Sequence, residues 1–66
     1  MARFAEIKNT ISGTGQQPKS VYVNPLNVIA IEPIHSGTRI ALNGGASYQT
    51  SETLNQVLAV IQEAML

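Results

Sequence analysis

The chain has 66 residues and no cysteine, and its four basic residues balance four acidic ones. A single domain of this size buries only about 60% of the surface that its unfolded chain exposes, so we expect marginal stability. Neither a disulfide nor a thiolate metal site can add to it. The charges are dispersed in a neutral chain, which gives no long-range attraction to nucleic acid or to anionic membranes.

The sequence also predicts the cellular location of the protein and the polarity of its surface. The first residues lack the apolar core of a secretion signal, and no apolar run approaches the roughly 20 residues that span a bilayer, so we expect a cytoplasmic protein with no membrane contact. Charged residues make up 12% of the chain, against an average of about 25%. Much of the surface must then be amide, hydroxyl, glycine or apolar, which favours close association with another chain.

The first half of the chain predicts two strands and a loop. Apolar residues alternate imperfectly in "ARFAEIK", which predicts a strand over residues 2–8. Residues 10–20 contain glycines and a proline among small polar residues, so we expect a flexible loop there. The segment "SVYVN" predicts a second strand, with Tyr22 on the face opposite to its valines. This strand ends at Asn24-Pro25, because proline removes a ladder donor and holds the preceding residue out of the helical region.

The next segment, "NVIAIEPI" (residues 27–34), predicts a strand that is apolar on both faces. Such a pattern is typical of a strand that is covered on each side. Pro33 confines its own position to a strand end or an edge. Strict alternation places Val28, Ala30 and Glu32 on one face and Ile29 and Ile31 on the other.

The remainder predicts a hairpin and a helix. "HSGT" is a turn, "RIAL" a strand, and "NGG" indicates a tight hairpin because asparagine and glycine accept the positive φ of a type I′ turn. "ASYQT" returns as a short strand. We expect a helix over residues 51–65 that is capped by Thr50 or Ser51, with Glu52 in its first turn. Its apolar side recurs at helical spacing through Leu54, Val57, Leu58, Ile61 and Met65.

These elements predict one α+β domain over residues 1–66. It consists of a twisted antiparallel sheet of four to five strands, a β-meander, followed by one C-terminal amphipathic helix. One helix covers only one face of such a sheet. Apolar side chains are worth roughly 1.5–3 kcal/mol each on burial, so we expect a homo-oligomer, a dimer or larger, and an unidentified protein partner. The interface candidates are Tyr22, Ile29, Ile31, Tyr48, Met65 and Leu66.

A pattern of turn and core residues runs through about two-thirds of the chain, from Val21 to Gln62. It consists of Val23, Asn24, Ile29, Glu32, Thr38, Ile40, Leu42, Asn43, Gly44, Tyr48, Ser51 and Glu52. This pattern resembles the small flagellar and swarming-motility proteins of the FlbD family, and it is also similar to the first half of LytTR-type DNA-binding domains, in which further strands hold much of the DNA contact surface. The resemblance implies the same fold, and the LytTR similarity implies a nucleic-acid-binding regulator as the alternative role. An accessory role in a bacterium, phage or mobile element is expected from the absent catalytic constellation and the apolar, charge-poor surface.

No catalytic or metal-binding constellation stands out. His35, the single histidine, would need Ser36 and Glu32 to form a nucleophile and base set, and an exposed turn histidine is the favoured interpretation. We expect Glu32 to pair with Arg39 across the hairpin rather than to act as an acid. Without cysteine or aspartate, a zinc site is not expected. The Gly13, Gly15, Lys19 and Ser20 spacing matches neither a Walker nor a dinucleotide loop. We therefore expect neither a cofactor nor an enzyme.

Nucleic-acid binding is the second hypothesis. Phosphate contacts would come from four dispersed cations, and base stacking would come from aromatic rings on the sheet. A neutral chain makes this a weak electrostatic footprint. The leading expectation is a non-catalytic accessory or protein-interaction domain. The candidate contacts with nucleic acid are Arg3, Lys8, Lys19 and Arg39, with Phe4, Tyr22 and Tyr48.

Overall fold

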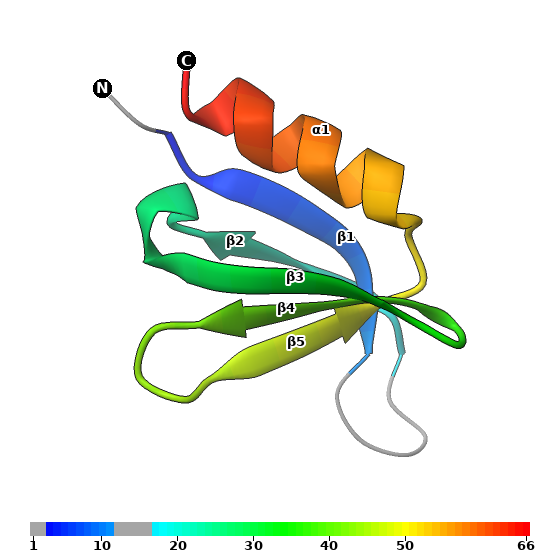
Figure 1. Cartoon of the computed structure of the whole chain (residues 1–66). Coiled ribbons are helices and arrows are strands. Elements are labelled where there is room, and N and C mark those ends of the chain that lie inside the picture. The colour runs from blue at the N-terminus through cyan, green and yellow to red at the C-terminus, as the bar shows by residue number, and fades with distance from the viewer. Residues whose placement is uncertain (1–2, 12–16) are drawn as a thin grey trace.

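The computed structural model describes residues 3–11 and 17–66. It contains five antiparallel strands and one C-terminal helix, which confirms the α+β class (Figure 1). β1 continues to Ile11 and β2 begins at Lys19, so the connection is shorter than the predicted loop of residues 10–20, and its centre lies outside the described residues. The elements are β1 (Ala5–Ile11), β2 (Lys19–Val23), a 3-10 turn η1 (Pro25–Asn27), β3 (Val28–Ile34), β4 (Gly37–Leu42), β5 (Ser47–Thr50) and α1 (Leu54–Ala64).

The strand order is β2-β1-β5-β4-β3, and each neighbouring pair is antiparallel. β3, β4 and β5 form a meander, while β1 pairs with β5 and leaves β2 and β3 as the two edges. Val23 of one edge strand and Val28 of the other pack into the same hydrophobic cluster. The sheet therefore curls into an incomplete barrel, in which the ladder between β2 and β3 is the one that is missing.

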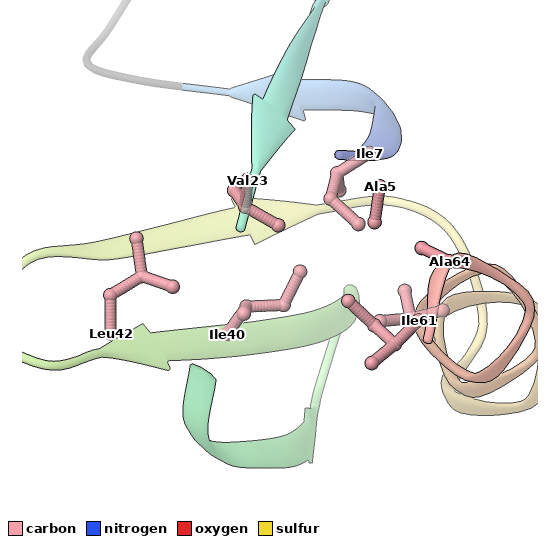
Figure 2. Close-up of a cluster of buried hydrophobic side chains, with 8 residues drawn as sticks. Ala5, Ile7, Val23, Ile40, Leu42, Ile61 and Ala64 are labelled. Atoms are coloured by element: carbon pink, nitrogen blue, oxygen red, sulfur yellow. The ribbon is translucent and has the colours of Figure 1, made fainter. Parts of the chain in front are cut away.

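The interior of this barrel is the hydrophobic core. Side chains from β1, β2 and β4 point inward, and α1 packs against β1, β3, β4 and η1 to close the interior from one side (Figure 2). Each buried aliphatic side chain contributes about 1.5–3 kcal/mol. The buried members of the cluster are Ala5, Ile7, Val23, Ile40, Leu42, Val57, Ile61 and Ala64.

The outward face of the central strands is mostly polar. Lys8, Arg39 and Gln49 are exposed on β1, β4 and β5, with Ile11 as an exposed apolar residue opposite Gln49. The expectation that a second chain must cover a whole apolar face of the sheet is therefore wrong, because the curled sheet encloses its own apolar side. The apolar surface that remains exposed is concentrated elsewhere, as described below.

A bulge in β3 changes which residues face the core. Val28 lies opposite Leu42, whereas Ala30 lies opposite Ala41, the neighbour of Leu42. β3 therefore has one residue more than β4 at this point, and that residue is Ile29. Val28 and Ile31 then both pack against the core, while Ile29 and Ala30 are exposed. The predicted alternation, with Ile29 and Ile31 on one face, is corrected, because one added residue reverses the side-chain direction on one side of the bulge.

The hairpin and the helix cap differ from prediction in detail. The Asn-Gly-Gly hairpin between β4 and β5 is confirmed, but it has a four-residue connection in which Gly44 and Gly45 have φ of 95° and 90°. The helix begins at Leu54 and is capped by Thr53. The Thr53 hydroxyl accepts from Gln56 N at 3.2 Å, and Gln56 Oε1 accepts from Thr53 N at 2.8 Å. Thr50 is not the cap, because it still belongs to β5.

Candidate interaction surface

A shallow apolar groove of about 330 Å³ lies between β3 and the C-terminal half of α1. The bulge turns Ile29 and Ala30 outward at one wall, and Met65 follows the helix at the other. No charged side chain lines this groove. Its lining includes Pro25, Ile29, Ala30, Ile31, Ile61 and Met65.

Further apolar side chains are exposed at the same end of the molecule as this groove. The start of β1, the C-terminal end of α1, η1 and the start of β3 all lie at that end (Figure 1). Ile29 is 68% exposed and Leu66 is 85% exposed. We call this surface the apolar end, and it consists of Phe4, Leu26, Ile29, Met65 and Leu66.

Hydrogen bonds that involve the backbone fix the segments of the apolar end. Arg3 N donates to the Ala64 carbonyl at 2.9 Å, and Arg3 Nη2 donates to the Glu63 carbonyl at 3.1 Å. A cation at these carbonyls also complements the negative end of the helix dipole. At η1, Asn24 Oδ1 accepts from Leu26 N at 3.0 Å, which fixes the turn that presents Leu26 to solvent. The backbone that carries the apolar residues is therefore held in place by hydrogen bonds.

The two edge strands that flank the barrel opening differ in chemistry. β2 carries Lys19, Ser20 and Tyr22 as exposed residues, and a lysine on an edge strand discourages pairing with another chain. β3 carries Ile29 and Ala30 beside the groove, and Glu32 and Pro33 are exposed further along the strand. The part of the β3 edge whose chemistry suits burial is therefore the segment beside the groove.

The opposite end of the barrel is closed by three buried threonines that sequence reasoning missed. Thr10, Thr38 and Thr50 are cross-strand neighbours on β1, β4 and β5. Their hydroxyls donate to the carbonyls of Lys19 (2.7 Å), Glu52 (2.9 Å) and Lys8 (2.6 Å), respectively. Thr38 lies on the same face of β4 as the buried Ile40 and Leu42. The alternation of this strand could therefore have predicted that Thr38 is buried. Each hydroxyl is satisfied by backbone, so the cluster closes the fold and offers no nucleophile.

The residues considered for catalysis are not brought together. His35 is exposed in the turn between β3 and β4. Glu32 forms the predicted ion pair with Arg39, directly opposite it in the ladder, and both side chains are about half exposed. Among residues 3–11 and 17–66, no group of three or more histidine or acidic side chains is placed to hold a metal ion. Of the glycine-loop candidates, Gly13 and Gly15 lie outside the described residues.

The four cations considered for nucleic acid are spread over the molecule. Arg3 is hydrogen-bonded at the end of α1, and Arg39 is paired with Glu32. Lys8 and Lys19 are exposed on the neighbouring strands β1 and β2. Because affinity for phosphates depends on the number of cations that contact them, two lysines are a small basis for binding. Nucleic-acid binding stays a prediction.

The six predicted interface residues divide into three groups. Ile31 and Tyr48 pack against the core of their own chain. Tyr22 is 65% exposed, on the outward side of β2. Ile29, Met65 and Leu66 belong to the apolar end, which also contains Phe4 and Leu26, two residues that were not among the six.

No known protein family, curated protein or solved structure matches the chain. The resemblance to the flagellar family and to LytTR-type domains therefore stays a prediction. Within the described ranges, no helix has the length and apolar character needed to cross a membrane.

Proposed function

We propose that the chain is a non-catalytic accessory or protein-interaction domain that works as a homo-oligomer. The observation that carries this proposal is the apolar end. Single exposed apolar residues are normal on a protein surface. Here five large ones lie at one end of a domain of 66 residues, and two of them, Ile29 and Met65, line an apolar groove. An apolar groove with exposed apolar side chains near it is typical of interaction sites.

The free energy of burying the exposed apolar side chains favours self-association. Full burial of each such side chain is worth about 1.5–3 kcal/mol, and a domain this small has little stability to spare. The net charge is zero, so two copies approach without repulsion between their net charges. The grooves next to α1, of about 220, 290 and 330 Å³, lie at or below the usual 300–1,000 Å³ of small-molecule sites. A protein surface is the better-fitting ligand class.

Sedimentation equilibrium over a range of micromolar concentrations tests this proposal. We expect the wild-type chain to exceed the monomer mass, and Ile29→Ser to shift the equilibrium toward monomer because it places a hydroxyl at the apolar end. Tyr22→Ser is the matched control, since Tyr22 is equally exposed on a different face (65% against 68%), and it should associate like wild type. A wild-type chain that stays monomeric throughout, or equal weakening by both substitutions, would contradict the proposal.

A further inference from the structure

The edge of β3 suggests how two copies meet, and this inference rests on the proposed function. We infer that β3 of one protomer pairs antiparallel with β3 of its partner, with Ile31 on the two-fold axis. The sheets of the two protomers would then join edge to edge, next to the apolar groove.

The first argument comes from the backbone of β3. β4 pairs with β3 on one side, and no strand of the described chain pairs on the other. Alternate residues of an edge strand turn their N–H and C=O groups away from the sheet. Pro33 has no N–H, so it fits a position whose backbone groups point outward. Ile31, two residues earlier, has the same orientation and retains both its donor and its acceptor.

The second argument is self-complementarity. A two-fold axis requires that one surface fit its own copy. With Ile31 on the axis, its N–H and C=O exchange hydrogen bonds with those of Ile31 of the partner subunit. Ala30 then lies opposite Glu32 of the partner subunit. Alanine is small enough to leave the Glu32–Arg39 ion pair in place, so this register buries no unpaired charge.

The third argument is the contrast with β2, which is the other open edge. β2 carries an exposed lysine, whereas Ile29, Ala30 and Ile31 line the groove next to β3. A second copy presents the same apolar strand and the same neutral charge pattern. It therefore supplies both the backbone partners and the apolar surface that this edge lacks.

Amide hydrogen exchange by NMR tests the pairing directly. We expect protection of the Ile31 amide to increase with protein concentration, because its N–H is bonded only in the dimer. Protection of the Ile40 amide, on the central strand β4, is expected to reflect folding and to change less.

Two charge variants at one position test the register. Ala30→Glu places like charges opposite Glu32 of the partner subunit at two symmetric sites, and we expect the dimer Kd to rise about tenfold. Ala30→Lys places opposite charges there and should weaken the dimer much less than Ala30→Glu does. Gln49→Glu is the control for added negative charge, since Gln49 is exposed on the central strand β5, and it should leave the Kd unchanged.

The outcomes separate the two proposals. A chain that is monomeric at every concentration contradicts the proposed function and this inference together. An oligomer whose Ile31 exchange does not depend on concentration leaves the proposed function intact and overturns the β3 pairing. Concentration-dependent Ile31 protection, with equal weakening by Ala30→Glu and Ala30→Lys, overturns the register centred on Ile31.

Discussion

The two ends of the barrel close in opposite ways. At the threonine end, three buried hydroxyls donate to backbone carbonyls, and Asn9 Nδ2 donates to Glu52 Oε2 at 3.0 Å. At the apolar end, large side chains remain in water beside a groove. Unsatisfied buried polar groups are costly, and each of these threonine hydroxyls has a partner within the chain. The threonine end is therefore closed without a second protein. The second end has apolar surface still to bury, and that is where a partner adds most.

The largest effect should come from packing at the threonine end. A Cβ at Gly37 would overlap the backbone oxygen of Thr50 and lie 2.9 Å from Ser51 Cα, at a φ of +151°. We expect Gly37→Ala to lower the free energy of unfolding by more than about 3 kcal/mol. Gly44→Ala is the control, because Gly44 also has positive φ but has nothing within 4 Å. It should cost about 1 kcal/mol.

Urea unfolding followed by circular dichroism measures both glycine variants. Equal losses for Gly37→Ala and Gly44→Ala would mean that backbone conformation alone matters. The tight packing that distinguishes the threonine end from the rest of the molecule would then be refuted.

A smaller loss should follow from removing one hydroxyl of the same end. Thr50 Oγ1 donates to the Lys8 carbonyl and accepts from Glu52 N at 3.1 Å. Thr50→Val keeps the shape but leaves both backbone groups without this partner, so we expect a loss of about 2 kcal/mol in the free energy of unfolding. Thr50→Ser retains the hydroxyl and should recover most of that loss in the same urea titration. If valine and serine are equivalent, hydrogen bonding is not what closes this end.

The smallest effect should come from the anchor of the apolar end. Arg3→Ala removes the guanidinium from the Glu63 carbonyl at the C-terminal end of α1, and we expect a loss of about 0.5 kcal/mol in the free energy of unfolding. Lys8→Ala removes an exposed cation from the same strand region without this contact and should be neutral within error. A comparable loss for Lys8→Ala in thermal unfolding would point to a general charge effect.

The sequence predicted the parts of the fold that depend on periodicity and turn chemistry. The helix, the Asn-Gly-Gly hairpin and the Glu32–Arg39 pair follow from spacing alone, because neighbours on one face or across a short turn are fixed by local geometry. The β1–β5 pairing joins segments that are distant in sequence, so no local pattern indicates it.

The candidate surface was harder to predict, and two physical causes explain why. The bulge at Ile29 reverses the alternation of β3, so Ile31, expected on the same face as Ile29, packs inward. The curling of the sheet encloses Tyr48, which a flat sheet would leave available to a partner. Leu26 was missed because its exposure depends on the 3-10 turn that Asn24 and Pro25 form.

The bond from Arg3 N to the Ala64 carbonyl places the segment before β1 and the C-terminal end of α1 side by side, next to the proposed contact region. A bulky affinity tag or fluorescent fusion joined directly after Leu66 would emerge there and obstruct assembly by steric exclusion.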